Sequence, residues 1–167
     1  MTMAKMQEIT VDSGGLSTIT FSSISQNFTH LRLLGSLRDN RTVTVGDDLI
    51  VRFNGDTAAN YNYTVGSFPL GTNGLSQTSL TSIMRITSAA STANFFAAID
   101  LFIPNYSSTT VNKGAIANSG YGDGVTPNTR IGQGTWNSTA AITSISITPG
   151  SGTLFTQYSQ ITLYGIR

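Results

Sequence analysis

Apolar and polar residues alternate along most of this chain with a period of two, which is the pattern of β-strands that bury one face. The alternating apolar positions are Ile9, Val11, Ile19, Phe21, Leu31, Leu33, Leu37, Leu49, Val51, Phe53, Leu80, Met84, Ile86, Ile145, Ile147, Ile161 and Leu163. No segment has a clear period of 3.6 residues with helix caps, although residues 89–93 are compatible with one helical turn. The pattern therefore predicts an all-β protein.

The most apolar segment is 95–103, with the sequence FFAAIDLFI. Both of its faces carry apolar residues, so we predict a central strand that is covered on both sides for part of its length. Asp100 interrupts this run, and a carboxylate in such a strand costs free energy unless it is paired or exposed. We expect a structural or interface ion pair, with Arg32, Arg52 or Arg85 as the partner.

Residues that accept tight turns separate these runs. They stand at 14–15, 54–56, 73–74, 122–124 and 149–152. About eight strands at this spacing are typical of two antiparallel sheets packed as a sandwich. The weakly patterned tract 116–134 is predicted to be a surface loop with an edge strand. A length of 167 residues suits a single domain.

Composition changes the expected surface. Charged residues make up 10% of the chain, against about 25% in an ordinary soluble domain. Ser and Thr together number 45 of the 167 residues, so hydroxyls and amides must form much of the surface. Such a surface suits a protein that sits in an assembly. The net charge of +1 gives no electrostatic footprint for nucleic acid or an anionic membrane, and we predict neither as a partner.

The chain offers few groups for catalysis. It has no Cys, which excludes thiolate nucleophiles, disulfides and Cys-based zinc sites. Its one histidine, His30, lies on the polar face of a predicted strand, and no motif places a nucleophile and a carboxylate beside it. We therefore predict no catalytic residue, no metal and no cofactor.

The segment 47–66 holds the densest group of polar side chains. Asp47 and Asp48 begin a predicted strand and are expected to be solvated. Asn54, Asp56 and Asn60 supply the oxygen atoms that Ca²⁺ prefers, although their spacing is not that of an EF-hand. The favoured alternative is a shaped loop in which Asn and Asp form Asx turns. In that loop Tyr61 and Tyr63 would place their rings on the surface at a contact.

Further contact candidates lie elsewhere. Arg38 and Arg41 flank a predicted turn, where they are expected to be solvated; the alternative is that they bind a phosphate or the carboxylate of a neighbouring molecule. Tyr and Trp in loops are residue types that dominate binding surfaces. The predicted contact residues are Arg38, Arg41, Asn54, Asp56, Asn60, Tyr61, Tyr63, Tyr106, Tyr121 and Trp136.

Four blocks in order, FSSISQNFTHLRLLGSLR, LIVRFNGDTAANYNY, FIPNY and SQITLYGIR, span most of the chain. Together they resemble a family of small structural proteins encoded by tailed bacteriophages. The resemblance implies a jelly-roll β-sandwich, covering residues 16–167, on the capsid surface of a virion. It also implies a head decoration (cement) protein, typically a homotrimer, that binds the major capsid protein and braces the shell. Residues 1–15 would be an arm that reaches a neighbouring subunit or the capsid.

Two other functions remain open. A β-sandwich with aromatic loops also suits the receptor-binding domain of a tail fibre or spike, where Tyr121 and Trp136 would stack on host carbohydrate. A hydrolase that cuts host polysaccharide is the third possibility, although no carboxylate pair at a glycosidase spacing is evident.

Overall fold

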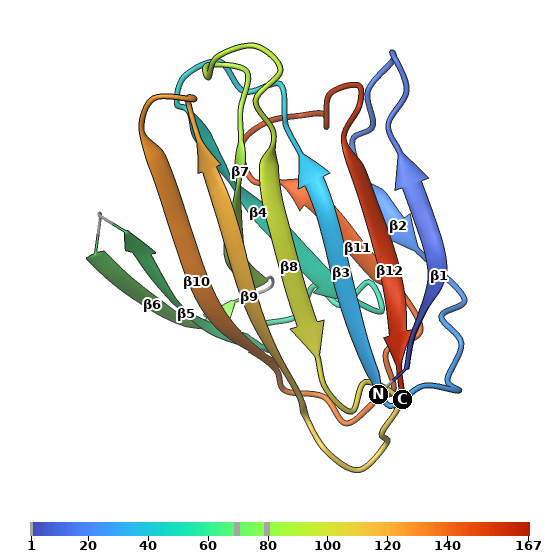
Figure 1. Ribbon diagram of the computed structural model, residues 1–167. Helices are drawn as coiled ribbons and strands as arrows, with labels where there is room; N and C mark the ends of the chain where they lie inside the picture. The colour runs from blue at the N-terminus through green and yellow to red at the C-terminus, as the bar shows by residue number, and fades with distance from the viewer. Residues whose placement is uncertain (1, 69–70, 79–80) are drawn as a thin grey trace.

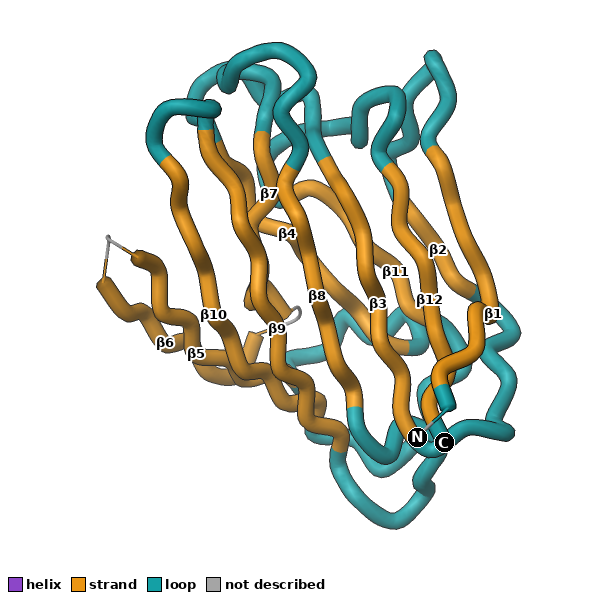
Figure 2. The backbone as a smooth tube through the Cα atoms, viewed as in Figure 1, coloured by secondary structure: helices purple, strands orange, loops and turns teal. Residues whose placement is uncertain are grey.

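The computed structural model describes residues 2–68, 71–78 and 81–167, and for residues 71–78 and 81 it describes the backbone alone. Figure 1 shows two β-sheets packed face to face, and Figure 2 shows that strands and loops account for the whole described chain. The described part contains no helix, and so none that is long and apolar enough to cross a membrane.

Eight antiparallel strands form the large sheet. In spatial order they are β1 (Met3–Thr10), β12 (Gln160–Ile166), β3 (His30–Leu37), β8 (Ala97–Ile103), β9 (Lys113–Gly122), β10 (Pro127–Trp136), β5 (Tyr61–Phe68) and β6 (Gly71–Thr78). Four strands form the small sheet: β2 (Ile19–Phe21), β11 (Ile145–Pro149), β4 (Gly46–Phe53) and β7 (Thr81–Thr87). The predicted two-sheet sandwich is thus confirmed.

The strand pairing is that of a jelly roll. Strands pair from the two ends of the chain inward, β1 with β12, β2 with β11, β3 with β8 and β4 with β7. Successive pairs alternate between the large and small sheets. A chain folded in this way is one long two-stranded ribbon that rolls up on itself, which is the jelly-roll arrangement of two Greek keys. The two chain ends lie side by side (Figure 1), where the Arg167 amide donates to the Thr2 carbonyl.

Two hairpins are inserted into this ribbon. The hairpin β5–β6 follows β4, and the hairpin β9–β10 follows β8. They extend the large sheet beyond β8 in the order β9, β10, β5 and β6. The edge strand β7 of the small sheet packs against β9, β10 and β5, so the inserted hairpins share the interface between the sheets.

The core lies between the sheets and uses the alternating apolar positions. The inner residues of β3, β4, β8, β11 and β12 are almost fully buried, as predicted, whereas Leu80 lies outside the described residues. Full burial of each large aliphatic side chain contributes about 1.5–3 kcal/mol. The central position of β8 is confirmed, although within this chain its outer residues Asp100 and Phe102 are only half-buried.

The prediction of a surface loop at 116–134 is wrong, because this tract forms most of β9 and β10 inside the large sheet. Its weak hydrophobic pattern has a packing cause. A Cβ atom added to Gly132 would lie 2.5 Å from the backbone oxygen of Ile83 in β7. The two sheets approach so closely here that small residues such as Ala115 and Ala117 fill the interface. A closely packed strand therefore resembles a loop in composition.

Smaller differences also appear. Residues 89–93 form turns and bends, with no helical turn, and the expected turn at 73–74 lies within β6. Residues 3–10, expected to be part of an arm, pair with β12 of the same chain as an edge strand. An arm that reaches another subunit would have to give up or exchange this pairing.

Candidate interaction surface

Four aromatic residues predicted to lie at a contact are buried. Tyr61 and Tyr106 are 0% exposed, Trp136 is 3% exposed and Tyr121 is 4% exposed. Their rings belong to the core, and their polar atoms have partners inside the protein; the Trp136 Nε1–H donates to Asp56 Oδ2 over 2.7 Å. The prediction that these rings form a contact surface is therefore wrong, because buried Tyr and Trp satisfy their polar tips within the fold.

The loop after β4 is a shaped structural loop. Asp56 Oδ1 accepts from the Ala58 amide as the predicted Asx turn requires, and Asp56 Oδ2 accepts from Asn60. Hydrogen bonds from Asn60, Trp136 and Ala58 lower the pKa of Asp56. Asn54 Oδ1 accepts from the amides of Thr143 and Ser144.

These oxygen atoms, which the calcium alternative requires, thus face protein donors. Within the described residues there is no group of three or more His, Asp and Glu that could hold a metal ion. Tyr63, the remaining aromatic of the loop, is half-buried against the core.

The two arginines of the β3–β4 connection also bind groups of their own chain, Arg38 from a buried position and Arg41 from a half-buried one. Arg38 is 8% exposed, and its guanidinium donates to the carbonyls of Ser91, Thr92 and Phe95. Arg41 donates to Asp47 Oδ1 over 2.8 Å. Asp47 itself is 1% exposed, so its predicted solvation is wrong. These side chains hold loops together and are not available as a phosphate site.

The surface that remains open is the side of the large sheet that faces away from the small sheet, called here the outer face. Strand register places its members in continuous rows across β3, β8, β9, β10 and β5. On these five strands the outer face consists of Arg32, Leu34, Ser36, Ala98, Asp100, Phe102, Gly114, Ile116, Asn118, Gly120, Thr129, Ile131, Gln133, Thr135, Asn62, Thr64, Gly66 and Phe68.

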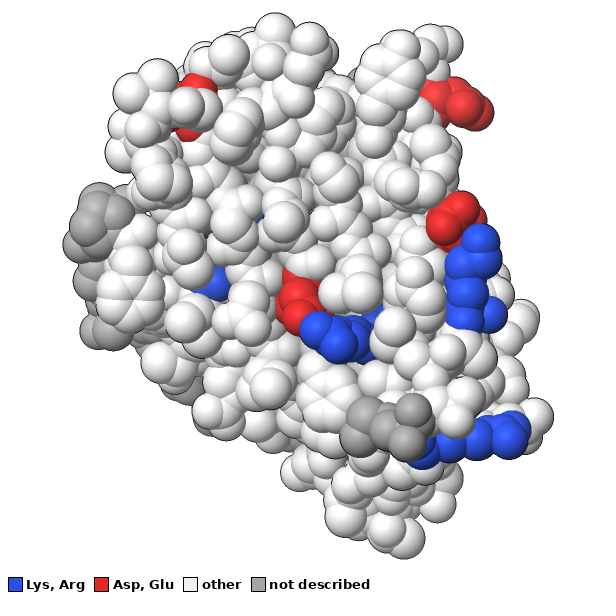
Figure 3. Space-filling model, in the orientation of Figure 1, with Lys and Arg blue, Asp and Glu red and all other residues white. Residues whose placement is uncertain are grey.

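Charge is scarce on the outer face and is paired where it occurs. Arg32 binds Asp100 in a bidentate ion pair, with Nε–Oδ1 at 2.9 Å and Nη2–Oδ2 at 2.6 Å. Asp100 is thus paired as expected, with Arg32, while Arg85 binds Asp48 instead. Figure 3 shows this side of the molecule as mostly uncharged, with one red and blue pair near its middle.

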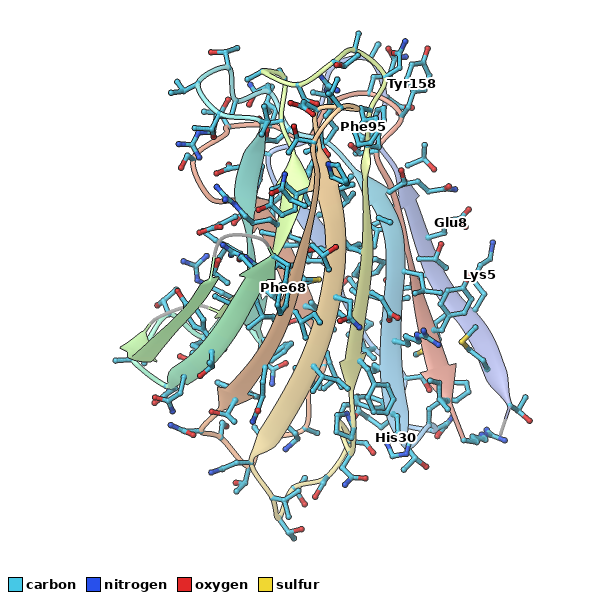
Figure 4. All side chains as sticks on the ribbon, turned by 60° about the vertical axis from the view of Figure 1, so that its left-hand side comes forward. Lys5, Glu8, His30, Phe68, Phe95 and Tyr158 are labelled. Atoms are coloured by element: carbon cyan, nitrogen blue, oxygen red, sulfur yellow. The ribbon has the colours of Figure 1, made fainter. Side chains whose placement is uncertain are left out.

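Large apolar side chains stand out from the outer face. Phe68, Ile116 and Ile131 are 61%, 57% and 52% exposed. They lie on three adjacent strands, and Figure 4 shows the Phe68 side chain in this part of the molecule. Single exposed apolar residues are ordinary, but several on one sheet face form a patch of the kind that marks interaction sites.

Shallow hollows lie between these side chains. One, of about 330 Å³, is lined by Arg32, Asp100, Phe102, Ile116, Asn118 and Ile166. A second, of about 460 Å³, is lined by Thr64, Gly66, Ile116, Ala117, Asn118, Ile131, Gly132 and Gln133. Ile116 lines both hollows, so raised and hollow regions alternate across the face.

Glycines at outward-facing positions of β9 add open space to this face. A Cβ atom added to Gly114 or Gly120 would meet no atom within 4 Å. The fold of the single chain therefore gives no steric reason for glycine at these two positions. Glycine within a strand often marks a place where another backbone or a ligand approaches closely. The arrangement suits contact with a broad surface.

His30 occupies one end of the large sheet. Its Nδ1 accepts from the Asn105 amide over 3.1 Å, and its ring centre lies 5.5 Å from that of Phe102. Within the described part of the chain, His30 therefore contacts a backbone donor and an aromatic ring.

Sequence reasoning missed the outer face, although a signal was present. Ile116 and Asn118 alternate with small buried residues, and Ile131 and Gln133 do the same on the next strand. This period of two would have indicated paired strands.

Comparison with protein-family models finds no match to the chain, and a search of curated proteins finds none either.

Proposed function

We propose that this chain is a structural protein of a tailed-bacteriophage virion that decorates the capsid and acts by adhesion through its outer face. The observation that carries the proposal is a broad, almost uncharged sheet face with exposed apolar residues and with glycines that the fold of the single chain does not require. Low charge over the whole chain and the four sequence blocks that resemble phage virion proteins support it.

The mechanism is mechanical. A rigid jelly roll presents the outer face to neighbouring subunits of the shell, and association as a homotrimer multiplies the number of contacts. Because linked contacts must all be released together, weak individual contacts add up to strong retention. The partners in this proposal are the major capsid protein and further copies of this chain.

A sedimentation experiment tests the proposal. Purified protein is mixed with heads of the phage that encodes it and, separately, with host cells, and each mixture is centrifuged. Sedimentation with heads supports decoration, whereas failure to bind heads contradicts it. The mass of the free protein in solution tests the homotrimer independently.

Two double variants test the surface. Ile116→Lys with Ile131→Lys places two charges on the outer face, and we expect head binding to weaken more than about tenfold. The matched control, Val43→Lys with Val125→Lys, changes two loop residues that are 81% and 86% exposed. Head binding should be unchanged in the control. Equal binding by both variants would exclude the outer face without excluding decoration.

The second candidate function is recognition of a host receptor by a tail fibre or spike. One observation favours it: Phe95 and Tyr158 are 39% and 69% exposed at the loop end of the sandwich, as Figure 4 shows. Exposed rings suit stacking on sugars. Sedimentation with host cells that is abolished by Tyr158→Ala would support this function over decoration.

A further inference from the structure

Two carboxyl groups lie together in the interior beneath the β11–β12 connection. Asp39 directly follows Arg38 after β3 and is 0% exposed, and Asp47 in β4 is 1% exposed. Both lie against Gly152, whose amide donates to Asp47 Oδ2 over 2.7 Å and on which a Cβ atom would lie 2.6 Å from Asp39 Oδ2. Two carboxylates have no donor between them, so a hydrogen bond between these side chains would require one to be protonated. A substrate cannot reach either group, so a catalytic role is not proposed.

Their hydrogen bonds show which one carries the proton. Asp47 Oδ2 accepts from the amides of Ser151 and Gly152 over 2.8 and 2.7 Å, and Asp47 Oδ1 accepts from Arg41. Asp39 Oδ1 accepts from the Arg41 amide over 3.1 Å. Asp39 Oδ2 is buried and has no hydrogen-bond partner among the described residues. A proton on Asp39 Oδ2, donated to Asp47, would satisfy that oxygen.

Asp47 and Asn40 together hold one specific segment, the turn at residues 151–154. Asp47 accepts from the first two amides of this turn, and Asn40 Oδ1 accepts from the amides of Thr153 and Leu154. All four amides are thus bound by side chains of the β3–β4 region. A Cβ atom on Gly152 would lie 2.6 Å from Asp39 Oδ2, so the turn packs directly on the acid pair.

We propose that Asp39 and Asp47 share one proton and form a pH-sensitive latch that holds the turn 151–154 against the sandwich and loosens when that proton is lost. Loss of the proton leaves two adjacent buried negative charges with Arg41 as their one direct cationic partner among the described residues. Opening of the turn admits water to both carboxylates and relieves their repulsion. The proton passes to solvent, and no other reactant is needed.

The direction of the pH effect follows from linkage. Burial, together with the hydrogen bond and charge of Asp47, raises the pKa of Asp39 from 3.8 to about 7. The stability that this proton provides is complete below about pH 4 and is lost as the pH rises to about 7. Burial acts to raise the pKa of Asp47, but hydrogen bonds from Asp39, Gly152 and Ser151 outweigh it and lower that pKa to about 2. The Asp47 contribution is lost only in strong acid.

Other charged groups around the latch have different partners. Arg38 directs its guanidinium to carbonyls of the β7–β8 connection, although its charge still acts on Asp39. Asp48 packs its Cβ against Gly150 and pairs with Arg85 and Arg130. Asp12 is exposed in the β1–β2 connection. The turn 150–156 and the segment 87–96 contain no charged residue.

Amide hydrogen exchange across pH tests the latch. After correction for intrinsic exchange, protection of the Ser151 and Gly152 amides should fall between pH 4 and 7, by at most about tenfold per pH unit, and then level off. We expect a total loss of at least about tenfold. Protection that stays constant over this range would overturn the proposal.

The variant Asp39→Asn isolates the cause, because its amide can donate to Asp47 as the protonated acid does but cannot titrate. Its protection should not vary with pH and should exceed that of the native chain at pH 8 by at least about tenfold. The control Asp100→Asn changes a carboxylate on the outer face and should keep the native profile, as should His30→Asn, which lies at the opposite end from Phe95 (Figure 4). A native profile in Asp39→Asn would refute the latch.

A measurement on the native chain decides the matter even if that variant fails to fold. The ¹³C resonance of the Asp39 carboxyl carbon should titrate with a midpoint near pH 7. A midpoint near pH 4, the ordinary value for aspartate, would show that no proton is held and would overturn the proposal.

Discussion

The two faces of the large sheet are built from the same strands but follow different rules. On the inner face, each position is determined by the opposite sheet: Gly132 has no room for a methyl group, and Arg130 is paired where it is buried. On the outer face, Gly114 and Gly120 have open space above them, and Ile116 and Ile131 are exposed. Folding of one chain explains the inner face fully and the outer face only in part.

The difference indicates where the function of this protein is located. The fold of the single chain does not require the exposed apolar residues and the glycines of the outer face. Their presence together on one face needs an explanation outside the single chain. Contact with another surface provides one. If this explanation holds, substitutions on the inner face should change stability, and substitutions on the outer face should change binding.

The largest expected effect is on the inner face. Gly132→Ala should lower the free energy of unfolding by about 3 kcal/mol, because its Cβ would lie 2.5 Å from the Ile83 backbone oxygen and force the sheets apart. Chemical denaturation measures this change. A loss below about 1 kcal/mol would show that β7 and β10 can separate at little cost.

The ion pair of the buried Arg130 is expected to matter next. Arg130→Met should cost about 2 kcal/mol, because Arg130 is 9% exposed in its side chain and donates to both Asp48 and Ser67. Asp48 keeps Arg85 as a partner, which limits the loss. Denaturation of this variant at pH 7 gives the value, and a cost indistinguishable from zero would contradict the assignment of Arg130 to the interior.

The ion pair of the outer face supplies the matched comparison. Arg32→Met removes a bidentate pair with Asp100, whereas Arg130 makes a single contact to Asp48, but the Arg32 side chain is 40% exposed against 9% for Arg130. Solvent screening limits the worth of such a pair to below about 1 kcal/mol. Stability should therefore change less than in Arg130→Met, while head binding weakens. A larger loss of stability in Arg32→Met would reverse the comparison between the faces.

Much of the fold could be predicted from the sequence, since alternation at Leu31 and Leu33 or at Leu49 and Val51 directly reports a buried face. The β9–β10 hairpin could not, because Ala117 and Gly132 are small for a reason that lies on another strand. Local patterns carry no information about how closely a distant strand will approach.

The contact residues were harder to predict, because residue type does not distinguish an exposed ring from a buried one. Trp136 and Tyr61 are the residues that favour binding surfaces, yet both satisfy their polar atoms inside this fold. The carboxyl pair was also missed, because seven residues lie between Asp39 and Asp47 along the chain and only the β3–β4 connection brings them together.

The smallest change in stability gives the sharpest test of the outer face. Gly114→Ala with Gly120→Ala should leave stability unchanged or raise it by up to about 1 kcal/mol, since alanine restricts the unfolded chain and its Cβ atoms meet nothing. Head binding should nevertheless weaken, because two methyl groups fill space that an approaching surface would use. Denaturation and sedimentation measured on the same protein separate the two effects. Binding equal to that of the native chain, together with unchanged stability, would show that these glycines serve no contact.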